Sequence, residues 1–159
     1  MIAKSLTFLV VFLLTISSST ILVNSKTIKI NSNKPYVFNF QNETTLYVGG
    51  NGPDNYSSIQ SAIDNANEGD TIFVYDDSSP YFENIFINKT IDLIGENKTT
   101  TVIDGGNISQ TITVVANGVL ISGFKIINGT DGVWLKTGSF NCTVSGNWIC
   151  YNFLWAVNI

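Results

Sequence analysis

The sequence contains no histidine and no arginine, so all eight of its basic residues are lysines. Without histidine the chain has no Ser-His-Asp or Cys-His catalytic relay and no histidine-built metal site. Without arginine it has no bidentate guanidinium clamp for phosphate or carboxylate groups. Two cysteines are too few for a four-thiolate zinc site or a disulfide framework. These absences remove several common kinds of enzyme and metal centre.

Charge is also scarce in this chain. Charged residues make up 13% of the 159 residues, whereas about 25% is usual in globular domains. A formal net charge of −4 and a pI near 4.5 argue against nucleic acid and anionic membranes as partners, because both attract basic patches. The abundance of asparagine, serine and threonine predicts a polar, uncharged surface that suits β-structure facing water or sugar.

Residues 1–25 have the features of a secretory signal peptide. Lys4 lies in a short basic region, residues 6–16 (LTFLVVFLLTI) are apolar, and Val23-Asn24-Ser25 is suited to signal peptidase. An uncleaved anchor is the alternative, because residues 6–23 approach the roughly 18 residues that a membrane-spanning helix needs. We expect a protein that is secreted or held at the cell surface, with no membrane contact beyond this segment.

An exported chain can carry N-linked glycans, which require an asparagine in an N-x-S/T triplet on an exposed surface. The sequence has more such triplets than its composition alone predicts. The alternative is that a chain so rich in asparagine, serine and threonine generates them without any glycan being attached. The candidate sites are Asn42, Asn55, Asn88, Asn97, Asn107, Asn128 and Asn141.

One segment has a helical pattern. Ile59, Ala62, Ile63 and Ala66 form an apolar stripe at helical spacing. Ser57 with Gln60 resembles a capping box, and Gly69 is a suitable C-terminal stop. We therefore expect an amphipathic capping helix over residues 57–70. Residues 26–56 are expected to form N-terminal strands and a Gly-rich connection, and residues 71–159 the rungs of a β-helix.

The strongest pattern is an internal repeat of short strands. Ile103, Ile126 and Ile149 are 23 residues apart, and Leu93, Ile121 and Val144 follow a similar spacing; Gly95, Gly123 and Gly146 lie two residues after each of these. A period in the twenties, with glycine and asparagine between short apolar runs, predicts a parallel β-helix with one rung per repeat. Isoleucine, leucine and valine at alternate positions would stack inward. An antiparallel sandwich with accidental spacing is the alternative.

The segments YSSIQSAIDNANEGDTIFVYDD, YFENIFINKTIDLIGEN, TVIDGG and VLISGFKIING resemble the N-terminal cap and first coils of right-handed parallel β-helix proteins of the pectin-lyase-like superfamily. More narrowly, they resemble the carbohydrate-binding and sugar-hydrolase repeat group. That group includes archaeal adhesin-like surface proteins and periplasmic copper-binding-protein-like chains. The resemblance covers residues 56–152 and implies an all-β fold. It does not fix the function, because this architecture carries lyases, hydrolases, adhesins and inert stalks alike.

The resemblance implies which residue types a catalytic member would use. Lyases of this fold use an arginine or lysine base beside aspartate-bound calcium, and hydrolases use clustered aspartates with a histidine. A remnant of such an enzyme would have to rely on Glu83, Asp92 and Lys125. Asp104 opens a turn and is expected to cap it. Because the usual arginine and histidine are missing, we expect a protein that is not an enzyme.

Metal and thiol chemistry give little support for a cofactor. Residues 49–56 (GGNGPDNY) match a calcium-binding nonapeptide, but a single copy cannot complete a site that neighbouring repeats share. We interpret this segment as a Gly-rich connection, with calcium as the alternative. Copper would have only Cys142, Cys150 and Met1 as soft ligands. We expect the two cysteines to be buried and unpaired.

Aromatic residues offer the best candidate for binding. Trp134 lies between Val133 and Leu135, so strand alternation would expose its ring if the two aliphatic residues are in the core. An exposed indole can stack against a sugar ring; a ring packed under a loop is the alternative. We expect an exported, non-catalytic, adhesin-like surface protein that binds or displays carbohydrate, with carbohydrate or neighbouring cell-surface proteins as partners. The alternatives are the lyase or hydrolase remnant and a structural spacer of the cell envelope.

The end of the sequence resembles the start of another rung. Residues 153–159 (FLWAVNI) are mostly apolar, and no polar terminal cap follows them. Repeat proteins normally cover such an end. We expect about three rungs in this sequence, and either a longer β-helix of which it is the N-terminal portion or a second chain that caps its end.

Overall fold

The computed structural model describes residues 19–23, 26–30 and 43–159. They belong to two units, residues 1–41 and residues 42–159. In the first unit, β1 (Ser19–Val23) and β2 (Lys26–Ile30) pair as an antiparallel hairpin. Apart from β1, the expected signal segment lies outside the described residues, so its role stays a prediction. Among the residues described, no helix has the length and apolar character that a membrane crossing requires.

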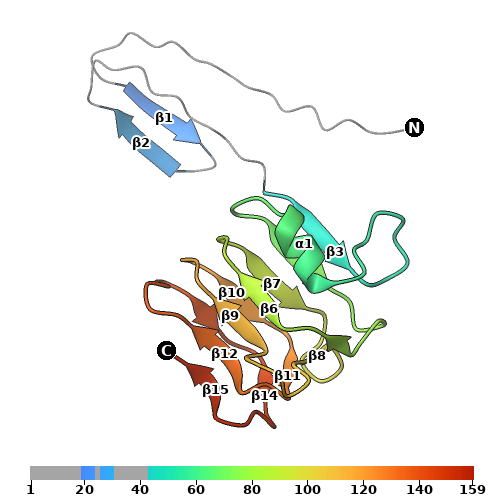
Figure 1. Cartoon of the computed structure of the whole chain (residues 1–159). Coiled ribbons are helices and arrows are strands. Elements are labelled where there is room, and N and C mark those ends of the chain that lie inside the picture. The colour runs from blue at the N-terminus through green and yellow to red at the C-terminus, as the bar shows by residue number, and fades with distance from the viewer. Residues whose placement is uncertain (1–18, 24–25, 31–42) are drawn as a thin grey trace. The chain divides into compact units, whose positions relative to one another are not determined.

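The second unit is a parallel β-solenoid of about five turns, shown in Figure 1. Its first sheet contains β3 (Thr45–Val48), β4 (Thr71–Val74), β7 (Asp92–Gly95), β10 (Leu120–Ser122) and β13 (Thr143–Val144). Its second sheet contains β5 (Tyr81–Phe82), β8 (Val102–Asp104), β11 (Lys125–Ile127) and β14 (Trp148–Ile149). Its third sheet contains β6 (Ile85–Ile87), β9 (Ile112–Val114), β12 (Asp131–Leu135) and β15 (Trp155–Asn158).

All strand pairs of the solenoid are parallel. The first turn contributes β3 alone, and from β4 onwards each turn adds one strand to each sheet. This confirms the all-β, parallel coil that the repeat predicts. The coil has about five turns, however, and not about three rungs. The two additional turns begin with β3 and β4, and the helix and loops near them change the length of each turn. The 23-residue period therefore becomes visible only further along the chain.

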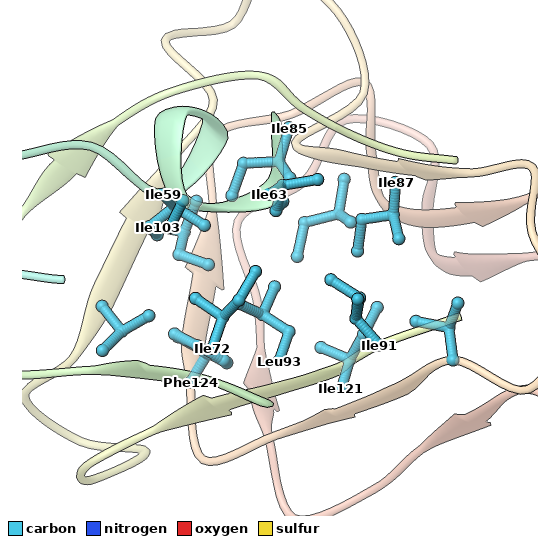
Figure 2. Close-up of a cluster of buried hydrophobic side chains, with 14 of the residues drawn as sticks. Ile59, Ile63, Ile72, Ile85, Ile87, Ile91, Leu93, Ile103, Ile121 and Phe124 are labelled. Atoms are coloured by element: carbon cyan, nitrogen blue, oxygen red, sulfur yellow. The ribbon is translucent and has the colours of Figure 1, made fainter. Parts of the chain in front are cut away.

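The core is a set of aliphatic columns that run from turn to turn. In the first sheet, Ile72 aligns with Leu93 and Leu93 with Ile121; in the second, Ile103 aligns with Ile126. All five side chains are fully buried, and Figure 2 shows most of them in one cluster. Burying a side chain of this size contributes about 1.5 to 3 kcal/mol to stability. The predicted register of the repeat is thus confirmed.

Two glycines lie where the backbones of neighbouring turns approach each other closely. A side chain on Gly95 would collide with the carbonyl of Gly123, and a side chain on Gly123 would collide with the carbonyl of Gly95. Gly123 also has a φ of +84°, in the region that favours glycine. Glycine is therefore required at this repeated position for two reasons: it allows the backbones of two turns to pack closely, and at Gly123 it allows a positive φ.

Helix α1 (Ile59–Asn65) covers one end of the core and is shorter than the expected residues 57–70. Its N-cap is Ser58 and not Ser57, because the Ser58 hydroxyl accepts the N–H of Ser61 at 3.2 Å. Ile59 and Ile63 are fully buried and face the same cluster as the strands (Figure 2). The apolar stripe predicted from the sequence is the face that packs on the coil.

The next turn of the solenoid supplies a charge to each end of α1. The Glu83 carboxylate accepts the N–H groups of Ile59 at 2.8 Å and Gln60 at 2.9 Å. At the other end, the Lys89 ammonium donates to the carbonyls of Ile63 and Ala66 at 3.0 and 2.8 Å. An anion at the N-terminus and a cation at the C-terminus both complement the helix dipole. These contacts fix the short helix on the coil.

Candidate functional site

The outer face of the third sheet carries Trp134 in the middle of β12. Val133 is fully buried and Leu135 packs against the core, so strand alternation turns the Trp134 ring outward, where it is half-buried. In register on either side of it lie Thr113 of β9 and Asn158 of β15. An indole flanked by a hydroxyl and an amide combines an apolar ring with hydrogen-bonding groups, which is what a sugar ring requires. Sugar stacking itself stays a prediction.

A lysine accompanies this tryptophan. The Lys136 ammonium lies over the Trp134 ring, 4.7 Å from its centroid. A second pair has the same chemistry on another sheet, with the Lys125 ammonium 4.9 Å from the centroid of Trp148. Each cation is attracted by the electron-rich face of the ring and is held beside it. The Trp134 face therefore offers an aromatic surface with a hydrogen-bond donor of positive charge.

The outer face of the first sheet carries another group of aromatic side chains, which was not predicted from the sequence. The rings of Tyr47 and Tyr75 are stacked, with centroids 6.0 Å apart and 23° between their planes, and Phe73 meets Tyr75 edge-on at 5.2 Å. The signal for this cluster was the alternation in two strands. Leu46 and Ile72 point inward in register, so Tyr47 and Phe73 beside them must point outward.

Four of the candidate glycosylation sites have accessible side chains. Asn88, Asn97, Asn107 and Asn141 are exposed. Their amide nitrogens, the atoms to which a glycan is attached, donate no hydrogen bond within the described part of the chain. The Asn97 carbonyl oxygen does accept two bonds from Thr99, but this leaves the amide nitrogen open.

Two other candidate sites use their amide nitrogens for structure. Asn55 is half-buried, and its side-chain amide donates to the carbonyl of Gly49 within the Gly-rich connection. Asn128 is half-buried as well, and its amide donates to the Asp104 carboxylate at 2.9 Å. Attaching a glycan there would displace these bonds. Asn42 lies outside the described residues.

The residues that the alternative of an enzyme remnant would use belong to different parts of the coil. Glu83 binds the first turn of α1, as described above. Asp92 begins β7 in the first sheet, in register between Thr71 and Leu120. Lys125 is in β11 of the second sheet, over Trp148. A pair of glycosidase carboxyls needs a shared cleft and a separation of about 5 to 9.5 Å, and these three residues have separate surroundings.

The segment for which calcium was the alternative, and the two thiols, can also be placed. Gly49 and Gly50 have φ values of +73° and +69° and turn the chain from β3 towards α1, as the interpretation of a Gly-rich connection predicts. No group of three or more histidine, cysteine or acidic side chains in the described residues is arranged to hold a metal ion. Cys142 and Cys150 are free thiols. Both are half-buried and not fully buried, because they lie in the outermost turn.

Two buried titratable groups stabilise the coil near α1. Burial would raise the pKa of Asp70, but hydrogen bonds from Asn67 and Thr44 hold it below its ordinary value of 3.8. Burial, together with the charges of Asp77 and Glu83, raises the pKa of Tyr81 to about 12. The Tyr81 hydroxyl donates to the carbonyl of Tyr75 at 2.7 Å. Both groups have structural partners and no open surface.

Comparison with known proteins gives one informative similarity. The chain is 33% identical, over 94 residues, to a protein of the archaeon Methanothermus fervidus named "Cell surface glycoprotein". This region is 59% of the present chain, whereas it spans 16% of the length of the archaeal protein. No family model matches the sequence. The similarity therefore relates a coil of this kind to a much longer protein that is named for the cell surface.

Proposed function

We propose that this protein is an exported cell-surface glycoprotein that binds or displays carbohydrate and does not turn it over. The proposal rests chiefly on the placement of the glycosylation triplets. Four of them, at Asn88, Asn97, Asn107 and Asn141, have exposed side chains whose amide nitrogens donate no hydrogen bond to any residue that the structure describes. The name of the similar archaeal protein supports the same location and modification.

The proposal of a non-catalytic role has its own support. The carboxylate that a hydrolase remnant would need, Glu83, accepts two backbone hydrogen bonds from α1 with both of its oxygens. A carboxylate held in this way is engaged in stabilising a helix. The chain has neither histidine nor arginine, and the lysine that a lyase remnant would use as a base, Lys125, lies over the Trp148 ring on another sheet.

Carbohydrate binding is proposed for the outer face around Trp134. The ring is half-buried, so part of its surface faces solvent. Lys136, Thr113 and Asn158 surround it with hydrogen-bonding groups. Because the adjacent cation is an ammonium, we expect a preference for sugars that carry a carboxylate or many hydroxyl groups.

A glycan array with the exported full chain tests this proposal. We expect binding to a restricted set of acidic or neutral glycans, no release of reducing or unsaturated sugars, and labelling of the protein on intact cells. Release of sugars that stops in the variant Glu83→Gln would contradict the non-catalytic role. Surface labelling without any glycan binding would favour a structural spacer of the cell envelope.

A further inference from the structure

The corner between β7 and β8 is longer than the same corner of the next turn. Six residues, 96–101, connect these two strands, whereas two residues, 123–124, connect β10 and β11. Residues 96–100 are all exposed, and Thr101, which ends the segment, is fully buried. The additional residues therefore form a surface loop on the coil.

Hydrogen bonds hold the base of this loop. The Asn97 N–H donates to the Thr101 hydroxyl at 3.0 Å. The Asn97 carbonyl accepts the N–H groups of Thr100 and Thr101 at 3.0 and 2.7 Å. The Thr100 hydroxyl also donates to the Asp76 carboxylate of the preceding turn at 2.6 Å. The loop thus has a defined conformation, while its outer residues face solvent.

The outer part of the loop is one of the candidate glycosylation triplets, Asn97-Lys98-Thr99. All three of its residues are exposed. Thr99 donates through its N–H and its hydroxyl to Asn97 Oδ1, at 3.0 and 2.8 Å. Among the residues that the structure describes, the triplet makes no hydrogen bond outside residues 97–101. A modifying enzyme can therefore bind this triplet without breaking a hydrogen bond between two turns of the coil.

The triplet that begins at Asn88 is tied to its neighbours. Its middle residue, Lys89, is half-buried and donates three hydrogen bonds to carbonyls at the end of α1. Its last residue, Thr90, donates its N–H to the Glu68 carboxylate at 2.6 Å. Drawing this triplet into the binding site of an enzyme would break the contacts that hold the C-terminal end of the helix.

The triplets at Asn107 and Asn141 are tied to the coil in a similar way. Ser109, two residues after Asn107, is half-buried, and its carbonyl accepts the N–H of Thr130 from the next turn at 2.9 Å. Thr143, two residues after Asn141, belongs to β13, and its N–H bonds to the preceding turn at 2.8 Å. Both triplets are part of the bonding between turns, although their asparagine side chains are exposed.

We propose that Asn97 is the position at which the folded coil accepts an N-linked glycan, and that the other three exposed asparagines accept theirs only while their own turns are open. This inference rests on the proposed function, in which the protein is a glycoprotein. In the transfer, the Asn97 amide nitrogen forms a bond to the anomeric carbon of a lipid-linked sugar phosphate. The bond from that carbon to the phosphate oxygen breaks, and the phosphate leaves with the electron pair. The amide proton passes to a base of the transferase.

Transfer of a glycan to the purified, folded chain tests this proposal. The full chain is exported from cells that lack an N-glycosylating transferase, and its folding is checked by circular dichroism. Membranes that contain the transferase and its lipid-linked donor are then added, and site-specific mass spectrometry follows each asparagine with time. Synthetic peptides of residues 85–93, 94–102, 104–112 and 138–146 give the rate for each triplet outside the coil.

We expect Asn97 of the folded chain to react at a rate within about threefold of its peptide. The other three exposed asparagines should react at least about tenfold more slowly than their peptides, because a turn of the coil must open first. Asn97→Gln should therefore remove nearly all transfer to the folded chain. Asn107→Gln, which also replaces an exposed asparagine of a triplet, is the matched control and should leave the transfer unchanged.

Two results would overturn the proposal. One is transfer to Asn97 of the folded chain that is slowed as much as transfer to the other three asparagines. The other is transfer to any of those three at the rate of its peptide. A failure of the proposed function gives a different result, because the protein exported by its native cells would then carry no glycan on any asparagine, whatever the rates measured with the folded chain.

Discussion

The Glu83 Oε1 atom accepts the N–H of Ile59 at 2.8 Å, which joins the second complete turn of the solenoid to the first residue of α1. The Oε2 atom accepts the next N–H, that of Gln60. A short helix has little stability of its own, so a carboxylate from a neighbouring turn is an effective way to hold it. The two residues are 24 positions apart in the sequence. The sequence alone therefore did not reveal the role of Glu83.

Replacing Glu83 should therefore lower stability. We expect Glu83→Ala to reduce the free energy of unfolding by about 2 kcal/mol, because two charge-assisted, part-buried hydrogen bonds are lost and two N–H groups at the start of α1 lose their partner. Urea unfolding measures the change. Asp54→Ala is the comparison, because Asp54 is an exposed carboxylate outside the helix that accepts no hydrogen bond among the described residues. A loss of equal size in that variant would show that the effect is not specific to the cap.

The lowered pKa of Asp70 predicts that the folded protein loses stability in acid. Its pKa in the folded chain is lowered by hydrogen bonds from Asn67 and Thr44. The stabilisation it provides is complete above the unfolded value of 3.8 and is lost as the pH falls through the lower, folded value. We expect the melting temperature of the wild type to fall below about pH 4. Asp70→Asn should be less stable at pH 7 and show a smaller fall in acid.

The exposed Asp64 provides the control for this experiment. Asp64→Asn removes a carboxylate at the surface of α1, so it should keep the acid profile of the wild type. If Asp70→Asn and the wild type lost the same stability between pH 5 and pH 2, the assignment of the acid sensitivity to Asp70 would be wrong.

The close approach of two turns predicts the effect of an added methyl group. Gly123→Ala places a Cβ against the Gly95 carbonyl and requires a positive φ of alanine. Gly138→Ala also requires a positive φ, but no atom lies within 4 Å of the added group. We expect Gly123→Ala to be the more destabilising by about 1 to 3 kcal/mol, because the backbones of two turns must shift. Equal losses in thermal unfolding would contradict close packing as the reason for this glycine.

The sequence predicted the middle of the solenoid better than its ends. The columns through Ile121 and Ile126 could be found because inward residues must match those of the turns above and below. The first two turns were not predicted, because α1 lies between β3 and β4 and interrupts the 23-residue period. The Trp134 ring could be placed from strand alternation alone. The contacts of Glu83 with α1 and of Asp70 with Thr44 could not, because both join residues more than twenty positions apart with no regular pattern.

The candidate glycosylation sites should divide into two groups. Glutamine replacements of Asn88, Asn97, Asn107 and Asn141 should each remove one glycan mass from the exported protein, because these side chains are exposed and their amide nitrogens donate no hydrogen bond among the described residues. Replacing Asn55 or Asn128 should leave the mass of attached glycan unchanged, since both amides are used inside the coil. Intact-protein mass spectrometry distinguishes these results. A glycan on Asn128 would contradict the structural role of its amide.

The measurement that tests the central claim most directly is the affinity of the Trp134 face for a glycan identified on the array, determined by titration calorimetry. Stacking of a sugar ring on an aromatic residue predicts that Trp134→Ala weakens binding by at least tenfold, equivalent to about 1.4 kcal/mol. Trp148→Ala, which removes the other tryptophan that has a lysine over its ring, should change the affinity by less than twofold. Unaltered binding by Trp134→Ala would contradict the account.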